Sequence, residues 1–228
     1  MTDRPIIFSA RMVQALLAGR KTQTRRLYKV PAGSYVEQGR VWAMTDGCAY
    51  GDAALPYAPG DRLYVREAWR TERGQDRQNA TEIAAACLDA GYSRVWCPTF
   101  YEVDAARVNF ENGMVAGRYR HARFMPRWAS RLTLTVTEVR VQRLQDISEA
   151  DAWAEGCKPG TLDDNGDPFP AEEPHPKGGW IGWDNARDWY ADLWESLHGP
   201  DAWATNPWVV AVSFTVQHGN IDAGGDHG

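Results

Sequence analysis

Two long segments of alternating apolar and polar residues constrain the fold of this 228-residue chain more than any other feature. They cover residues 131–144 and 207–217. Because successive side chains of a strand point to opposite faces of a sheet, this period of two predicts strands with one buried face. In the first segment the apolar positions shift by one near Thr137 and Glu138, which predicts a β-bulge, a feature common in small closed barrels.

Short stretches with the residue spacing of amphipathic helices separate the strands. We expect these helices at 9–19, 81–91, 148–156 and 184–199. Ser148 and Asp184 are the expected N-caps of the last two, and a glycine ends each helix. Further strands are expected at 5–8, 21–27 and 62–69. Strands outnumber helices, so the predicted class is α+β, built on a small, mostly antiparallel β-barrel with short helices.

Three longer stretches are interpreted as insertions into one domain, and two of them hold the expected helices 81–91 and 184–199. The domain is expected to cover 1–218, with insertions at about 28–58, 71–120 and 158–205. Residues 219–228 are expected to form a disordered tail.

The chain carries no sign of a membrane span or of export. A helix needs roughly 20 apolar residues to cross a bilayer, and the longest apolar runs are far shorter. Charged residues interrupt the first 20 positions, which excludes the apolar region of an export signal. We therefore expect a cytoplasmic protein with no membrane partner.

The cysteines and histidines predict neither a disulfide framework nor a metal site. Cys48, Cys87, Cys97 and Cys157 lie far apart without a C-x-x-C pair, which fits a reducing compartment. We interpret all four as buried or incidental thiols. The five histidines are scattered, so we expect no metal and no cofactor.

The net charge of −5 hides a strong asymmetry along the chain. Residues 1–144 hold 22 Lys and Arg against 14 Asp and Glu, whereas residues 145–228 hold 3 against 16. The basic residues concentrate further in 11–29 and 118–131, which contain no acid. Either these stretches bind an anionic ligand, or the acidic second half neutralises them within one fold, and charge alone leaves both readings open.

Three motifs occur in a suggestive order: 19–26 (GRKTQTRR), 59–65 (PGDRLYV) and 148–156 (SEADAWAEG). With the closing strand, they resemble the ASCH domain family, whose fold is a PUA-like β-barrel. The resemblance covers about half the chain, and the long insertions are similar to those of the larger ASCH proteins of phages and prophages.

The resemblance implies two activities. ASCH domains are proposed RNA-binding modules, and small bacterial members hydrolyse N4-acetylcytidine to cytidine and acetate. Those members use a lysine and a threonine of the G-x-K-T-x-T-x-R segment and a glutamate on the later short helix. Here these catalytic positions fall on Lys21, Thr24 and Glu155.

Amide hydrolysis needs a nucleophile, a base and an acid for the departing amine. Thr24 is a poor nucleophile without a base, and Lys21 serves as that base only if its pKa falls from about 10.4 toward neutrality. We expect the like charges of Arg20, Arg25 and Arg26 to lower it. Because Lys21 and Thr24 are three residues apart, they would lie on opposite faces of an ideal strand. For Lys21 to act as the base for Thr24, it must therefore lie in the turn after Gly19, from which its side chain can reach Thr24.

Glu155 is expected in the last turn of its helix, where the macrodipole disfavours a carboxylate by about 0.3–1 kcal/mol, which suits a proton shuttle. The alternatives to these roles are structural. Lys21 and Thr24 also fit a solvated basic strand, and Glu155 also fits an exposed helix acid.

Six further residues are candidates for substrate binding: Arg26, Glu67, Trp69, Arg127, Trp128 and Arg131. Glu67 lies on the apolar face of its predicted strand, and local violations of this kind concentrate at functional sites. A structural ion pair with Arg66, Arg127 or Arg131 is the favoured alternative. Trp69 and Trp128 lie beside basic strands and suit base stacking, against the alternative of core filling.

We therefore expect an amidohydrolase acting on an N4-acylated cytosine nucleoside or nucleotide. The first rival is a noncatalytic RNA- or nucleotide-binding module that uses the same basic cleft. The second is a phage accessory interaction protein. The sequence specifies neither the acyl group nor the oligomeric state.

Overall fold

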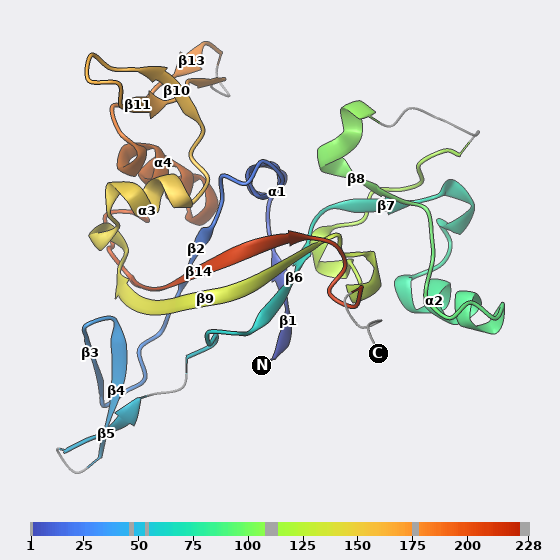
Figure 1. Ribbon diagram of the computed structural model, residues 1–228, viewed down its shortest axis with the longest axis horizontal. Coiled ribbons are helices and arrows are strands. Elements are labelled where there is room, and N and C mark those ends of the chain that lie inside the picture. The colour runs from blue at the N-terminus through green and yellow to red at the C-terminus, as the bar shows by residue number, and fades with distance from the viewer. Residues whose placement is uncertain (1, 46–47, 53–54, 108–113, 175–177, 224–228) are drawn as a thin grey trace. The chain divides into compact units, whose positions relative to one another are not determined.

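The computed structural model describes residues 2–45, 48–52, 55–107, 114–174 and 178–223, and its fold class is α+β, as predicted. Its main element is a mixed five-stranded sheet of order β1-β6-β9-β14-β2 (Figure 1). The strands are β1 (Asp3–Ile7), β6 (Arg62–Arg66), β9 (Leu132–Arg143), β14 (Trp208–His218) and β2 (Gln23–Leu27). β1 is parallel to β6, whereas the pairs β6–β9 and β14–β2 are antiparallel. Among the described residues, these strands do not close into a barrel.

The two segments with period-two alternation form the two longest strands. In β9 the apolar buried positions are Leu132, Leu134 and Val136 before the exposed Thr137 and Glu138, and Val141 after them, so their parity shifts where the sequence predicted, although Thr133 is buried as well. In β14, by contrast, residues 209–212 are buried on both faces of the strand. The alternation therefore located the inward face of β14 but missed that its other face is also covered.

The chain divides into two compact units where the sequence suggested one domain with insertions. The first unit, unit 1, comprises residues 1–17, 61–135 and 216–228. The second, unit 2, comprises residues 18–60 and 136–215. β9 and β14 each contribute residues to both units, and each unit is described by itself below.

Unit 1 holds β1, β6 and two helices. The helices are α1 (Ala10–Leu17) and α2 (Ala80–Asp89), which confirms both helix predictions for this part of the chain. The predicted strand 62–69 is interrupted at Glu67 and continues as β7 (Trp69–Thr71), which pairs with β8 (Thr99–Tyr101). Short 3-10 helices occupy Arg73–Gln75, Glu102–Arg107, Ala122–Phe124 and Arg127–Ala129.

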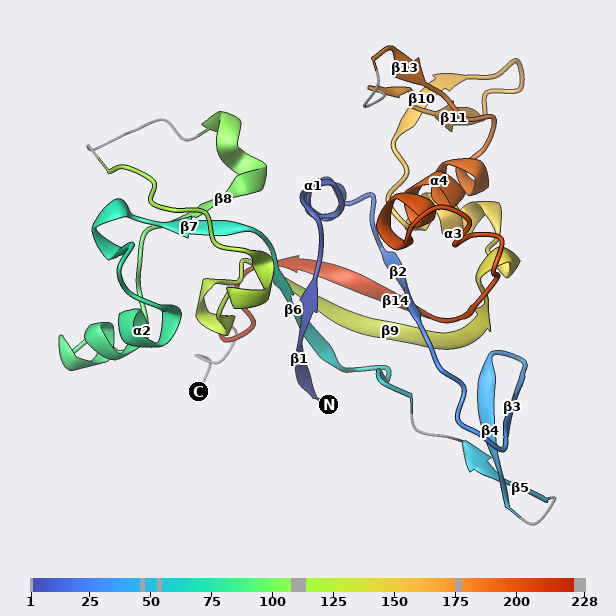
Figure 2. The same ribbon diagram turned by 180° about the vertical axis from the view of Figure 1, so that it is seen from behind.

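Unit 2 contains β2, a small sheet and two helices that lie side by side, α3 (Glu149–Ala154) and α4 (Ala186–His198) (Figures 1 and 2). Ser148 caps α3 as predicted, but the N-cap of α4 is Asn185 and not Asp184, because the Asn185 side chain accepts the Asp188 N–H. A 3-10 helix, Leu144–Asp146, precedes α3.

The two expected insertions of unit 2 contain regular pairing that the sequence did not indicate. Within 28–58 lies a three-stranded antiparallel sheet of β3 (Ser34–Glu37), β4 (Arg40–Thr45) and β5 (Cys48–Asp52). Within 158–205 lie two short hairpins. They pair β10 (Pro159–Leu162) with β11 (Pro168–Pro170) and β12 (Glu173–Pro174) with β13 (Trp180–Ile181).

The tail expected to be disordered begins with an ordered turn at 219–223. The Asn220 side chain donates to the Arg127 and Ser130 carbonyls at 2.7 and 2.9 Å, and Ile221 is buried. These contacts explain the order over 219–223, and residues 224–228 lie outside the described part. No helix in the described residues is both long and apolar enough to cross a bilayer.

Candidate functional site

The basic segment that follows Gly19 docks onto the carboxyl end of α3. Gly19 has a φ of 70°, a left-handed value that glycine adopts without strain. The Thr22 N–H then donates to the Ala154 carbonyl at 2.9 Å, and the Arg20 guanidinium donates to the Gly156 carbonyl at 2.5 Å. The last carbonyl groups of a helix lack partners within the helix. The basic segment therefore supplies hydrogen-bond donors to the carbonyl groups at the carboxyl end of α3.

Lys21 lies at the centre of this junction, paired with Glu155. The two residues form an antiparallel bridge, and the Lys21 Nζ donates to the Glu155 carboxylate at 2.7 Å and to the Glu155 carbonyl at 2.9 Å. Glu155 is the C-cap of α3, one position beyond the turn in which we expected it. The structure thus brings together two of the three predicted catalytic residues, separated by 134 positions in sequence.

Burial lowers the pKa of Lys21. The side chain is 0% exposed, and desolvation disfavours its charged form. The Glu155 carboxylate opposes this effect, while Arg26 and Arg25 contribute smaller lowering effects on the pKa. We expected the arginines to lower the pKa of Lys21, and the larger cause is instead the loss of water around the ammonium group.

The pair belongs to a larger buried ion cluster, which consists of Lys21, Gln23, Arg25, Asp151 and Glu155. Arg25 donates to Glu155 and to Asp151, each at 3.0 Å. Gln23 links the two sides, since its amide accepts from Arg25 at 2.6 Å and donates to Asp151 at 3.2 Å. Lys21, Gln23 and Arg25 are two residues apart from one another, so they lie on one face of the extended segment, and this face contacts the acids of α3.

Thr24 lies between these positions in sequence and has a different partner. It is 1% exposed, and its Oγ1 accepts a hydrogen bond from the Arg26 guanidinium at 2.9 Å. Arg26 also donates to the Arg25 carbonyl at 3.1 Å and is the half-buried member of this group. The predicted nucleophile and the predicted substrate-binding arginine are therefore in direct contact.

Sequence reasoning missed three members of this neighbourhood, namely Gln23, Asp151 and Tyr190. Asp151 and Glu155 are four residues apart, so they lie on one face at the end of α3. Lys21, Gln23 and Arg25 likewise lie on one face of the basic segment. These two spacings are the sequence signal that could have predicted the contact. Tyr190 of α4 lies below Arg25, with 5.8 Å between the guanidinium carbon and the ring centroid. Burial raises the pKa of Tyr190, and Glu155 adds to this effect.

The remaining five binding candidates lie in unit 1. Glu67 is 1% exposed and forms a two-bond ion pair with Arg131, at 2.8 and 3.0 Å. Arg131 also binds Asp104 at 2.5 Å and lies 3.9 Å above the centroid of the Tyr101 ring. Glu67 thus has the structural ion pair that we favoured as the alternative, with Arg131 as the partner.

The two tryptophan candidates belong to a core cluster. Trp69 is 0% exposed and packs with Met125 and Ala129, so no face of its ring is open to a nucleobase. Trp128 packs edge-on against Trp69, with 5.9 Å between the ring centroids. For Trp69 the structure corrects the stacking interpretation, because burial of the whole ring excludes it.

Arg127 is held by two carboxylates of the same unit. It donates to Asp3 at 2.6 Å and to Asp222 at 2.6 Å. Asp3 also pairs with Arg62, so the basic residues here are matched by nearby acids. Of these two acids, Asp222 belongs to the acidic second half that the charge pattern offered as a neutralising partner, whereas Asp3 lies in the basic first half.

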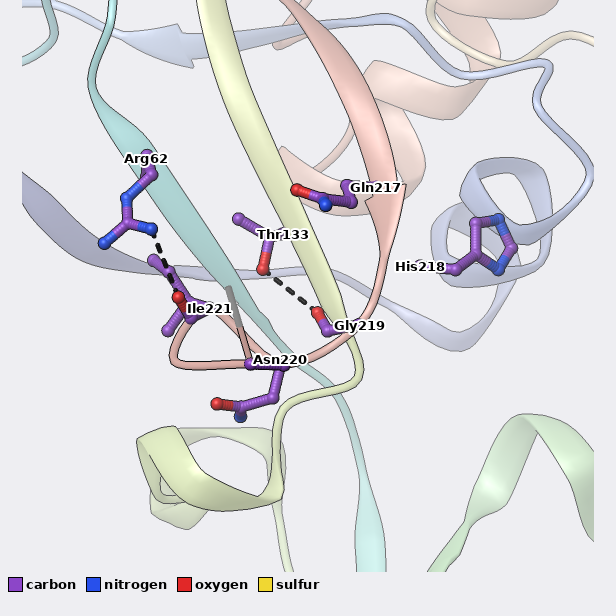
Figure 3. A pocket seen from close by; sticks show the side chains of 8 residues that line it. Arg62, Thr133, Gln217, His218, Gly219, Asn220 and Ile221 are labelled. Carbon is purple, nitrogen blue, oxygen red and sulfur yellow. Dashed lines mark hydrogen bonds between the residues drawn. The ribbon is translucent and has the colours of Figure 1, made fainter. Parts of the chain in front are cut away.

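One pocket of unit 1 lies beside the ordered turn (Figure 3). It has a volume of about 390 Å³ and is lined by polar and backbone groups around Arg62 and Thr133. Figure 3 shows Arg62 bonded to the Ile221 carbonyl and Thr133 bonded to the Gly219 carbonyl. These bonds stabilise the turn, and no predicted site residue lines the pocket.

A second pocket, of about 450 Å³ in unit 2, is lined by four acids: Glu149, Asp163, Asp167 and Asp184. Glu149 accepts the Ala186 N–H at the start of α4, and Asp163 accepts the Asn165 and Asp167 N–H groups. Two of these acids thus have structural hydrogen bonds. Within the described ranges, no group of three His, Cys, Asp or Glu residues is placed to hold a metal ion.

Comparison with known proteins adds no relative to this picture: no family model matches the chain, and neither a curated protein nor a solved structure matches it significantly.

Proposed function

We propose that this protein is an amidohydrolase of the ASCH type that removes an acyl group from an N4-acylated cytosine nucleoside or nucleotide. The observation that carries the proposal is the Lys21–Glu155 pair. A lysine that is fully buried, has a lowered pKa and is bonded at 2.7 Å to a carboxylate is suited to proton transfer.

The proposed roles follow from the chemistry of the side chains. Lys21, in its neutral form, accepts the proton of the Thr24 hydroxyl while Oγ1 attacks the acyl carbon. The C–N4 bond then breaks, the amine leaves with a proton relayed through Glu155, and the acyl group remains on Thr24 as an ester. Water hydrolyses this ester, so the acyl group leaves as a carboxylic acid and the Thr24 oxygen regains its proton.

Access to the reacting groups passes through Arg26 in this proposal. Lys21, Thr24 and Glu155 are 0%, 1% and 2% exposed, so a substrate reaches Thr24 only after a neighbouring group has moved. Arg26 is bonded to Thr24 Oγ1 and is half-buried. We therefore assign Arg26 to substrate binding, with its guanidinium exchanging the Thr24 bond for one to the acyl or base oxygen.

We also propose that the five-stranded sheet, which does not close among the described strands, is related to the PUA-like barrel of ASCH domains, and that the protein works in the cytoplasm. The order of the motifs supports the first point, because the 19–26 and 148–156 segments meet in the structure through Lys21 and Glu155. The free thiols of Cys87, Cys97 and Cys157 support the second.

The rival function, RNA binding at the same basic cleft, has less support. It needs arginines that are free to meet phosphates, and Arg25 is 2% exposed between two carboxylates. Arg127 and Arg131 are likewise bonded to acids. Phosphate contacts from these residues would first require these ion pairs to break.

The test is incubation of the purified protein with N4-acetylcytidine, with cytidine measured by chromatography. We expect turnover by the wild type, loss of turnover in Thr24→Val and retention in Thr24→Ser, because serine keeps the hydroxyl that valine lacks. Thr22→Val is the matched control, since Thr22 is exposed and carries no proposed role. Thermal unfolding of each variant establishes that it is folded.

Two results would contradict the proposal. If folded wild-type protein releases no cytidine from any acylated cytidine, the protein is not this amidohydrolase and the binding and interaction alternatives regain priority. If Thr24→Val retains wild-type turnover, the nucleophile is another group.

A further inference from the structure

Arg25 lies in the middle of the buried ion cluster of unit 2 and binds both of its acids. Its Nη1 donates to Oε1 of Glu155 at 3.0 Å, and its Nη2 donates to Oδ2 of Asp151 at 3.0 Å. The amide oxygen of Gln23 accepts a further bond from Nη1 at 2.6 Å. The Arg25 side chain is 0% exposed and lies over the ring of Tyr190. Because the planar guanidinium is held at two of its nitrogens, its direction is fixed by the fold.

The two oxygens of the Glu155 carboxylate have different partners. Arg25 binds Oε1, whereas the Lys21 Nζ binds Oε2 at 2.7 Å. Since a carboxylate is planar, the bond from Arg25 to one oxygen turns the other oxygen toward the lysine. Arg25 thus determines how Glu155 faces Lys21 without a bond of its own to the lysine amine.

Charges of opposite sign alternate from the surface of unit 2 to Lys21. The order is Arg140, Asp151, Arg25, Glu155 and Lys21, and the side-chain exposures are 27%, 20%, 0%, 2% and 0%. Arg140 of β9 binds the same oxygen of Asp151 as Arg25 does. Asp151 is therefore shared between two arginines, and Arg25 keeps positive charge to offer to Glu155.

This arrangement has a consequence for the proton of Lys21. When Lys21 is neutral, Glu155 loses one of its cations in a site that is 2% exposed, and a buried carboxylate without a cation is costly. Arg25 remains at the carboxylate and stays charged, because arginine keeps its proton in proteins. Burial is the largest cause that lowers the pKa of Lys21, and the charges of Arg26 and Arg25 add to it, whereas Glu155 opposes it.

We propose that Arg25 is the positioning residue of the Lys21–Glu155 pair: it holds Glu155 as an anion turned toward Lys21, so that the lysine can release its proton without leaving a buried carboxylate unpaired. The use of this arrangement rests on the amidohydrolase function proposed above, in which neutral Lys21 takes the Thr24 proton and Glu155 passes it to the departing amine. Arg25 itself moves no proton and acts through Glu155.

The experiment follows the Lys21 proton by NMR of protein labelled with ¹³C at the lysine ε-carbon. The chain has four lysines, so few signals are expected, and the signal that Lys21→Met removes is that of Lys21. We expect wild-type Lys21 to lose its proton below its ordinary pKa of 10.5. Arg25→Gln should raise the pH of this transition by about 1–3 pH units, the range for one charged neighbour.

Two further variants separate the charge of Arg25 from a general disturbance of the segment. Arg20→Gln is the matched control, because Arg20 precedes Lys21 and donates to the Gly156 carbonyl, and it is bonded to no carboxylate among the described residues. It removes the same charge from the same segment and should leave the Lys21 transition at the wild-type pH. Arg25→Lys keeps a positive charge and should raise the transition by less than Arg25→Gln does.

The variant Arg25→Gln leaves each acid with a cation, namely Lys21 for Glu155 and Arg140 for Asp151, so it should fold. Thermal unfolding checks this. A second measurement needs no variant at Arg25: in wild-type protein labelled with ¹³C at the glutamate carboxyl groups and assigned through the backbone, the Glu155 signal should stay that of an ionised carboxylate throughout the Lys21 transition.

Three results would overturn the proposal: a Lys21 transition in Arg25→Gln at or below the wild-type pH, an equal rise in Arg20→Gln, or a wild-type Glu155 that takes up a proton as Lys21 loses its own.

The pH profile of kcat/KM with N4-acetylcytidine connects this proton to turnover. Its acid limb reports the base, so Arg25→Gln should move the limb upward as far as the NMR transition. A limb that stays in place would also overturn the positioning role. Absence of turnover by the wild type would remove the proposed function, while the NMR transitions would still decide the role of Arg25, so the two failures are distinguishable.

Discussion

The buried ion cluster of unit 2 and the Glu67–Arg131 pair of unit 1 show how the choice of cation changes what a buried carboxylate can do. Both Glu155 and Glu67 are nearly inaccessible, at 2% and 1% exposure. Glu67 faces the fork of an arginine with two bonds, whereas Glu155 faces Lys21 as well as Arg25. Arginine stays protonated in proteins, but lysine gives up its proton when burial lowers its pKa.

This difference separates a structural pair from a candidate for proton transfer. The planar guanidinium of Arg131 holds Glu67 and Asp104 together and stacks on Tyr101, so it fixes geometry without moving a proton. Burial lowers the pKa of Lys21, which favours the neutral amine more than in a lysine surrounded by water. Sequence inspection alone made both glutamates candidates, and only the identity of the partner distinguishes them.

The largest expected effect is on stability, through the loss of one carboxylate. Glu155→Gln should lower the free energy of unfolding by about 3–5 kcal/mol, because it removes the carboxylate that is bonded to both Lys21 and Arg25, whose side chains are 0% exposed, and leaves only Arg25 with a second carboxylate partner in Asp151. Glu67→Gln should cost less, about 1–3 kcal/mol, because Arg131 keeps Asp104 and is 24% exposed. Urea unfolding at pH 7 measures both values. Equal losses would contradict the distinction between the two sites.

A second prediction concerns the pH dependence of stability, which should have opposite signs at the two sites. The folded-state pKa of Lys21 lies below its ordinary value of 10.5, so between these values the unfolded chain binds more protons and this group makes stability rise with pH. Burial raises the pKa of Glu67 above its ordinary value of 4.5, so above 4.5 the folded chain binds more protons and stability falls as pH rises.

Variants isolate these two contributions. Lys21→Met should remove the rise on the alkaline side, and Glu67→Gln should remove the fall on the acid side, each by up to about 1.4 kcal/mol per pH unit. Denaturation curves over a pH series provide the measurement, with each variant serving as the control for the other. If Lys21→Met leaves the stability profile unchanged on the alkaline side, Lys21 does not titrate there. If Glu67→Gln leaves it unchanged on the acid side, Glu67 does not titrate there.

The smallest effect is expected at the exposed end of unit 1. Asp222 is 56% exposed where it meets Arg127, and exposed ion pairs contribute little because water and salt screen them. Asp222→Asn should therefore lower the free energy of unfolding by less than about 1 kcal/mol. Thermal or urea unfolding at low and high salt checks this. A loss as large as that of Glu155→Gln would mean that the ordered turn depends on the pair.

Much of the local structure could be predicted from the sequence, because its signals act over a few residues. Helical spacing and capping located α1, α2 and α3, and the alternation located β9 and β14. Local signals failed where pairing decides the structure, as in the β3-β4-β5 sheet, whose strands carry little periodicity. The Asp184 cap failed because Asn185, one residue later, offers the same kind of acceptor in the position where the helix begins.

The candidate site was predictable in part. The sequence alone supplied the residue types, the motif order and the requirement that Lys21 follow a turn at Gly19, since these depend on chemistry and on chain geometry over a few positions. Only the tertiary structure decided which carboxylate each cation meets. Lys21 and Glu155 are joined across 134 positions, and Glu67 finds Arg131 across 64, because packing brings these strands and helices together. Burial, which lowers the pKa of Lys21 and removes Trp69 from solvent, is likewise a property of the folded chain, set by neighbours that no local pattern names.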